Sequence, residues 1–200
     1  MTLTVLSVMF TAIISQNIVL SQYQGICPFL GVSKKMSSAA GMGLAVIFVM
    51  AISSVFCWLV YEYVLTPLEL EYLSTMAFIL VIASLVQLLE MALRRFSPTL
   101  YSALGVYLPL ITTNCAILGT ANSTIVFSSY ESFGMVFAAS VATGMGFLLA
   151  ICLLAGVRLK TDKADIPKCF KGFPITLVTA GIMAMAFAGF SGMVGGWTYG

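Results

Sequence analysis

Long runs without a single charged residue constrain the fold of this chain more than any motif does. Six such runs cover most of its length, at residues 1–33, 36–61, 72–89, 96–130, 132–157 and 172–200. A helix needs about 20 mostly apolar residues to cross the hydrocarbon core of a bilayer. Only 8% of the residues are charged, whereas a soluble domain carries about 25%. Lipid is the solvent that tolerates this composition.

The runs predict an all-α integral membrane protein with six transmembrane helices and no soluble domain, so that residues 1–200 form a single transmembrane domain. The spans are predicted at 3–24, 39–61, 71–93, 100–121, 132–157 and 173–194. The first run lacks the basic segment and the small-residue cleavage site of a secretory signal. We therefore expect it to be the first span.

The basic residues predict the orientation of the spans. All nine Lys and Arg residues follow the first, third and fifth spans, at Lys34 and Lys35, at Arg94 and Arg95, and between Arg158 and Lys171. The loops after the second and fourth spans carry only acidic charges. The positive-inside rule therefore places the odd-numbered loops in the cytoplasm and both termini outside.

Glu90 is the acidic residue nearest to the interior of a span. It stands four residues before Arg94, which favours an ion pair one helical turn long. The alternative is a carboxylate on an ion pathway.

Two segments of the chain match each other. Cys27–Gly31 and Cys115–Gly119 share the pattern Cys-x-x-Leu-Gly, and Gly41-Met42-Gly43 is echoed downstream by Gly144-Met145-Gly146. Each half of the chain, about 1–95 and about 96–200, contains three predicted spans. An odd number of spans reverses direction from one repeat to the next, so we expect two inverted three-helix repeats.

Both cysteine motifs lie in uncharged runs that are longer than one crossing requires. Residues that weaken helices occur in each run, namely Gly25, Pro28 and Gly31 in the first, and Gly105, Pro109 and Gly119 in the second. Polar residues accompany them, namely Asn17, Gln22 and Gln24, and Thr112, Thr113 and Asn114. We expect spans 1 and 4 to be interrupted near the membrane midplane, where such breaks mark binding sites. The alternative is that the glycines are helix-packing contacts and the cysteines fill the core.

The five cysteines and the absence of histidine limit the chemistry. Without histidine, the chain offers no imidazole for metal binding or acid–base catalysis, and the isolated chain is not expected to be catalytic. Cys27 and Cys115 could supply two thiolates to a metal centre, and an iron–sulfur cluster would need two more, from a second chain. A disulfide between them and a solute site remain alternatives. Cys57, Cys152 and Cys169 have no motif around them.

The motifs resemble the RnfA family, to which the NqrE subunit of the sodium-pumping quinone reductase is closely related. The resemblance rests on Cys27 to Lys35, Gln87 to Met91, Leu108 to Gly119 and Ile175 to Gly192, and it covers nearly the whole chain. Pro28 and Thr113 favour RnfA over NqrE, in which Thr and Val are expected at these positions.

The resemblance implies a subunit of the Rnf complex, a ferredoxin:NAD⁺ oxidoreductase that translocates Na⁺ or H⁺ across the bacterial or archaeal cytoplasmic membrane. It implies that Cys27 and Cys115 bind half of a [2Fe-2S] cluster, which is shared with a homologous RnfE-like subunit of inverted orientation. That cluster would relay electrons from a cytoplasmic iron–sulfur subunit to a flavin on the outer face. Flavin and nicotinamide would be bound by other subunits among RnfB, RnfC, RnfD and RnfG, and no nucleic-acid partner is expected. The alternatives are a small inverted-repeat transporter and a purely structural membrane subunit.

Overall fold

The computed structural model describes residues 7–68, 70–96, 110–111, 113–127, 133–161, 167 and 171–198. These residues form helices and connecting segments, with no strand among them. Five α-helices recur in the argument below besides the short helix α7, and their bounds are α2 (Ile26–Val32), α3 (Met36–Val60), α4 (Ser74–Phe96), α8 (Phe133–Thr161) and α9 (Phe173–Thr198). The described part of the chain is therefore all-α, as the sequence predicts.

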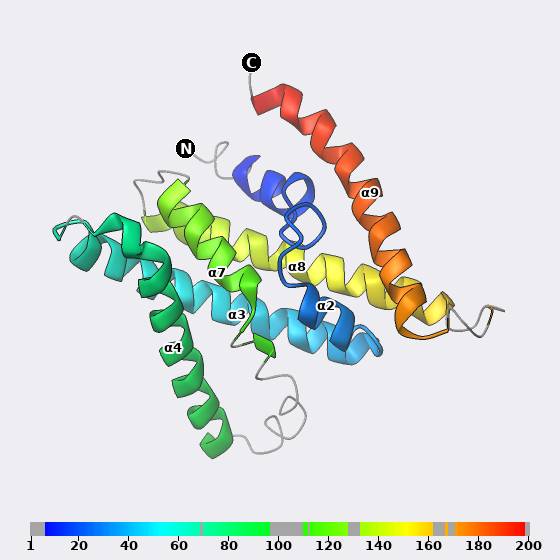
Figure 1. Cartoon of the computed structure of the whole chain (residues 1–200), viewed down its shortest axis with the longest axis horizontal. Coiled ribbons are helices and arrows are strands. Elements are labelled where there is room, and N and C mark those ends of the chain that lie inside the picture. The colour runs from blue at the N-terminus through cyan, green and yellow to red at the C-terminus, as the bar shows by residue number, and fades with distance from the viewer. Residues whose placement is uncertain are drawn as a thin grey trace.

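An antiparallel pair of long helices, α3 and α8, forms the centre of the fold (Figure 1). The two helices approach closely because glycines stand at the contact. A Cβ atom on Gly144 would lie 3.1 Å from the Cα of Ile47, and one on Gly43 would lie 3.2 Å from the Cα of Leu148. The two Gly-Met-Gly segments that the sequence pairs are thus contact points between these helices, with Gly43 and Gly144 facing the opposite helix.

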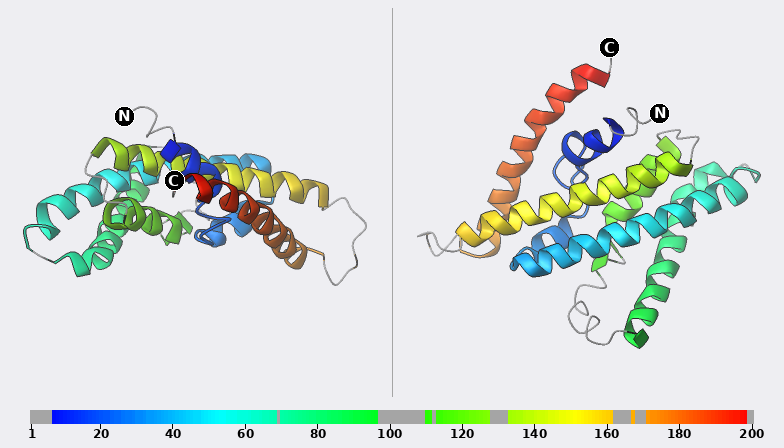
Figure 2. Two further views of the ribbon diagram at one scale, coloured as in Figure 1. Left: turned by 90° about the horizontal axis from the view of Figure 1, so that it is seen from above. Right: turned by 180° about the vertical axis from the view of Figure 1, so that it is seen from behind.

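Three helices are long and apolar enough to cross a membrane, at Met36–Leu65, Ser74–Met91 and Phe133–Thr161, and a shorter apolar helix covers Phe173–Gly189. They correspond to the predicted spans 39–61, 71–93, 132–157 and 173–194. The helix α3 continues through a π-helical segment, η2 (Tyr61–Leu65). In Figures 1 and 2, α4 leans away from one end of the central pair, and α9 leans away on the other side.

The first apolar run is not one continuous span. Residues 7–15 are helical and end in the π-helical segment η1 (Thr11–Ser15), residues 16–25 are not helical, and α2 follows. The prediction of a span at 3–24 is wrong in this respect, because the helix ends nine residues earlier. The predicted cause is also wrong for Pro28 and Gly31, which lie inside α2. Proline is tolerated at Pro28 because the first N–H groups of a helix have no partner within it.

Asn17 organises the segment without helical structure. Its side chain is fully buried, and its Nδ2 donates to the carbonyl oxygens of Ile13 at 3.0 Å and Gly146 at 2.8 Å. Its Oδ1 accepts from the backbone N–H groups of Val19 and Leu20, at 3.1 and 3.3 Å. One carboxamide therefore replaces several backbone hydrogen bonds that the missing helical turns would have made, and it ties the break to α8.

The second apolar run also contains a break. The helix α7 (Cys115–Ala121) begins after Thr113 and Asn114, which are not helical, and it continues into the π-helical segment η4 (Asn122–Phe127). Gly119 lies inside α7, so the prediction that Gly119 interrupts a helix is wrong. Gly105, Pro109 and Thr112 lie outside the described residues, as do the first ten positions of the span predicted at 100–121.

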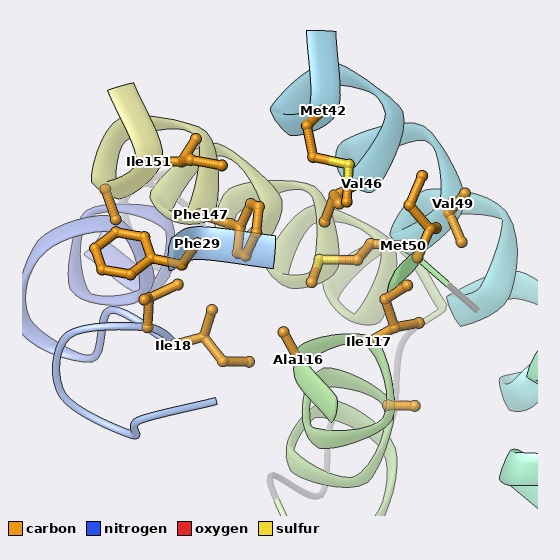
Figure 3. Close-up of a cluster of buried hydrophobic side chains, with 14 of the residues drawn as sticks. Ile18, Phe29, Met42, Val46, Val49, Met50, Ala116, Ile117, Phe147 and Ile151 are labelled. Atoms are coloured by element: carbon orange, nitrogen blue, oxygen red, sulfur yellow. The ribbon is translucent and has the colours of Figure 1, made fainter. Parts of the chain in front are cut away.

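The apolar core lies where α2 and α7 meet the central pair. Figure 3 shows Phe29 from α2 and Ile117 from α7 gathered with Met50 of α3 and Phe147 of α8. These side chains are at most 2% exposed. Large apolar side chains also cover much of the outside, including Phe48, Leu80 and Ile182, which suits contact with lipid or with other membrane subunits.

Two predictions fall outside the described residues. Glu90 is partly buried on α4, but the side chain of Arg94 is not among those described, so their ion pair stays a prediction. Cys169 also lies outside the described ranges.

Candidate functional site

The two cysteine motifs adopt the same local structure. Each forms a seven-residue helix, in which Cys27 is the second residue of α2 and Cys115 is the first residue of α7. Their burial patterns also match, because in each motif the cysteine is exposed and the next two residues are buried. The internal similarity of the sequence is therefore a similarity of structure at these two places.

Both motif helices pack against the same support. Each of α2 and α7 contacts α3 and α8, and their inward side chains, Phe29 and Ile117, join one core. Each motif directs its two inward residues into this core and leaves its cysteine exposed on this chain. The thiols of Cys27 and Cys115 are free, so the disulfide alternative is not what the structure contains.

A hydrogen bond links the segment before one motif to the cysteine of the other. The backbone N–H of Gly25 donates to the Sγ of Cys115 over 3.0 Å, across 90 residues of sequence. Gly25 has φ +76°, in the left-handed region, and it is the residue directly before α2. The neighbouring Asn114 caps α7, because its Oδ1 accepts from the N–H of Ala116 at 3.1 Å. The backbone next to both cysteines is thus fixed by specific contacts.

Two buried polar atoms beside the motifs have no partner among the residues that the structure describes. They are the Nδ2 of Asn114, a donor, and the Oε1 of Gln24, an acceptor. The amide of Asn114 cannot simply be turned over, because its Oδ1 caps α7. Gln24 Oε1 lies against Gly119, where a Cβ atom would overlap it. Buried donors without acceptors are costly, so the one at Asn114 indicates room for a group with acceptor atoms next to Cys115.

Arg158 of α8 holds the other end of α2. Its Nη1 donates to the carbonyl oxygen of Leu30 at 3.3 Å and to the Oγ of Ser33 at 3.1 Å, and the residue is only 9% exposed. The last carbonyl groups of a helix have no partner within it, and a cation there also interacts favourably with the helix dipole. Arg158 therefore fixes the helix that carries Cys27.

The other cysteines differ from this pair. Cys57 is fully buried in the core on α3, and Cys152 is partly buried on α8. Within the described ranges, no group of three or more cysteine, aspartate or glutamate side chains could hold a metal ion. The chemistry that the site offers is therefore that of two exposed thiols, which can bind soft metals as thiolates but cannot complete a four-thiolate site alone.

Sequence reasoning found Cys27 and Cys115 but missed two residues that position them. It treated Gly25 only as a residue that weakens helices, although its N–H contacts Cys115 Sγ. It treated Arg158 only as a marker of orientation. No signal in the sequence distinguishes Arg158 from the basic residues of the loop that follows it, because its partners, Leu30 and Ser33, lie more than 120 residues away.

Comparisons with known proteins agree with this description. Residues 5–194 match the family model described as Rnf-Nqr subunit, membrane protein. The chain is 53% identical over 191 residues to a component of the Na(+)-translocating ferredoxin:NAD(+) oxidoreductase complex of Acetobacterium woodii, covering 96% of this chain and 98% of the relative. It is 49% identical over 193 residues to a component of the ion-translocating oxidoreductase complex of Syntrophotalea carbinolica, with the same coverage of 96% and 98%.

The corresponding protein of Cronobacter sakazakii is 50% identical over 182 residues, covering 91% of this chain and 93% of the relative. All three relatives carry the letter A in the naming of their complexes, which confirms the expected resemblance to RnfA. The chain therefore belongs to the Rnf-Nqr family of membrane subunits.

Proposed function

We propose that this chain is the membrane subunit of an ion-translocating oxidoreductase complex, in which it helps electrons to cross the membrane. The names of its relatives, at about 50% identity over nearly the full chain, support membership of such a complex. The observation that carries the electron-transfer role is the pair of exposed cysteines at matched positions of α2 and α7. The chain acts as part of the complex and is not catalytic by itself.

The proposed architecture has six crossings in two inverted repeats, about 1–95 and about 96–200. Three long apolar helices and the shorter one support four of the crossings. The two interrupted runs, which contain α2 and α7, are proposed as the remaining crossings, with their breaks near the midplane. The matched structure and burial of the two motifs support the repeat. An inverted relation between the halves would present the two motifs to one site.

The proposed cofactor is a [2Fe-2S] cluster shared between two chains. Such a cluster needs four thiolates, and Cys27 and Cys115 would supply two of them. The residues fit this role, because both thiols are exposed and because Asn114 Nδ2 is a buried donor with no acceptor among the described residues. When bound, the cluster supplies one-electron transfer. The residues of this chain hold it, and Gly25 and Asn114 are the donors next to Cys115.

The second pair of thiolates is proposed to come from a homologous, RnfE-like subunit in inverted orientation. The exposure of both cysteines on this chain leaves them accessible to such a partner. The remaining subunits, RnfB, RnfC, RnfD and RnfG, would bind flavin and nicotinamide and would donate and accept the electrons. We place the chain in the cytoplasmic membrane with both termini outside, since the basic residues follow the odd-numbered spans.

Cysteine variants of the whole complex test this proposal. Cys27→Ala and Cys115→Ala should each abolish electron transfer from reduced ferredoxin to NAD⁺ by the purified complex, measured by the formation of NADH. Cys57→Ala and Cys152→Ala are the controls and should retain most of the activity, since these side chains are not at the site. The composition of the complex is checked in each variant, so that loss of assembly is not mistaken for loss of electron transfer.

Two other outcomes would favour the alternatives. Normal activity in an assembled Cys115→Ala complex would contradict the electron-transfer role, and a structural subunit would then be the better description. Transport of a solute or ion by the purified chain alone in vesicles, without iron, would favour a small transporter.

A further inference from the structure

We propose that Gly25 is a positioning residue whose backbone N–H sets the reduction potential of the metal centre bound through Cys115. This inference rests on the proposed function and adds to it a named determinant of that potential. The observation that carries it is the hydrogen bond from the Gly25 N–H to Cys115 Sγ, at 3.0 Å.

Two independent features require glycine at this position. The φ of +76° lies in the left-handed region, which costs a residue with a Cβ atom roughly 1 kcal/mol. A Cβ atom there would also lie 3.0 Å from the Cβ of Ala116, 3.1 Å from Asn114 Oδ1 and 3.1 Å from Phe147 Cε2. All three neighbours are buried, so they cannot simply move into solvent. The contact with Cys115 therefore depends on the absence of a side chain at Gly25.

The amide is held firmly enough to act as a fixed donor. Gly25 is itself buried, and its carbonyl oxygen accepts from the N–H of Phe29 at 3.3 Å, inside α2. On the other side, the Asn114 cap fixes the start of the helix that carries Cys115. Donor and acceptor thus belong to two separate motifs, each locked to the same core, and the N–H···S distance is a property of the fold.

The sign of the effect follows from electrostatics. Adding an electron to a thiolate-bound metal centre increases the negative charge on its sulfur ligands. A fixed N–H donor stabilises the more negative state more strongly, so the bond raises the reduction potential, and hydrogen bonds to sulfur are a known determinant of such potentials. Removing or lengthening it should lower the potential. Among the hydrogen bonds of the described residues, Cys27 Sγ has no matching donor, so the effect should act through Cys115.

The test compares two glycines of the same segment in the purified complex. Gly25→Ala perturbs the N–H···S contact. Gly31→Ala is the matched control, because Gly31 lies in α2 and its nearest neighbour to a Cβ atom would be Leu110 Cδ1 at 4.0 Å. The reduced signal is followed by EPR during a redox titration. At the wild-type midpoint, we expect the ratio of reduced to oxidised centre to fall roughly three- to tenfold in Gly25→Ala, as for the loss of one hydrogen bond, and to stay unchanged in Gly31→Ala.

A second measurement does not depend on the folding of a variant. The wild-type complex is produced with ¹⁵N-glycine, and pulsed EPR of the reduced centre should detect a glycine ¹⁵N coupled through the hydrogen bond. Gly31→Ala should retain this coupling. An unshifted potential in assembled Gly25→Ala, or the absence of the ¹⁵N coupling from the wild type, would overturn the inference while leaving the metal centre in place. The absence of any such EPR signal from the wild-type complex would instead overturn the proposed function and this inference with it.

Discussion

The contact between α3 and α8 gives a prediction whose sign differs between glycines of the same helix. On α3, a Cβ atom at Gly43 would overlap the side chain of Leu148 and lie 3.2 Å from its Cα, whereas one at Gly41 would meet no atom within 4 Å. On α8, a Cβ atom at Gly144 would lie 3.1 Å from the Cα of Ile47, whereas one at Gly156 would again meet nothing. Replacement of each glycine by alanine therefore separates the helix propensity from the packing.

The magnitudes follow from two opposing effects. Alanine is favoured over glycine inside a helix by about 0.5–1 kcal/mol. At Gly43 and Gly144 the added methyl group meets backbone atoms, so the helices must move apart by a few tenths of an ångström, and such overpacking costs about 1–3 kcal/mol. We expect Gly43→Ala and Gly144→Ala to destabilise the protein by about 1 kcal/mol or more, which is the difference between these effects. Gly41→Ala and Gly156→Ala should stabilise it by up to about 1 kcal/mol.

The assay is thermal unfolding of the purified complex, or of the chain in detergent, followed by the loss of helical circular dichroism. The two contact variants should unfold at lower temperature than the wild type, and the two open-site variants at the same or higher temperature. If Gly144→Ala and Gly156→Ala shifted the unfolding temperature equally, the close approach of α3 and α8 at these glycines would be refuted.

Two further predictions concern residues that hold the interrupted segments. Arg158→Gln should lower the free energy of unfolding by about 1.5–3 kcal/mol, because hydrogen bonds from a charged group to Leu30 and Ser33 are lost; Arg95→Gln, at an exposed position, is the control, and equal effects in thermal unfolding would contradict the role of Arg158. Asn17→Ala should cost about 2 kcal/mol or more, because it leaves buried backbone groups without partners. Exposed Gln22 is the matched position, and a Gln22→Ala variant that lost as much stability as Asn17→Ala would argue against it.

The long helices could be predicted from the sequence because lipid imposes one simple requirement. A segment that crosses a bilayer must satisfy its backbone hydrogen bonds internally, so an uncharged run of sufficient length becomes a helix. The predicted spans at 39–61 and 132–157 accordingly match Met36–Leu65 and Phe133–Thr161 within a few residues. Here, charge pattern and length carry nearly all the information.

The interrupted segments could be predicted only in part. Sequence analysis found both cysteine motifs and the polar residues beside them, but it assigned the first break to Pro28 and Gly31. Those residues are compatible with the short helix α2, where a proline in the first turn costs little. The break extends over residues 16–25 because Asn17 forms hydrogen bonds with α8 and with its own neighbours, and such tertiary contacts leave no periodic pattern in a sequence.

The same reason explains why the surroundings of Cys115 could not be predicted. The donor at Gly25 lies 90 residues away, and nothing in the two local sequences announces the contact. The cysteines themselves were identifiable because they recur in matched motifs, whereas the residues that position them act through the fold.

The most direct test of the central claim is iron content together with low-temperature EPR of the complex purified without oxygen. The wild type is compared with Cys27→Ala and Cys115→Ala. We predict a [2Fe-2S] signal in the reduced wild-type complex that is lost in both variants while the complex remains assembled. An unchanged signal and unchanged iron content in both variants would contradict the account, and the two cysteines would then be packing residues of a transporter or structural subunit.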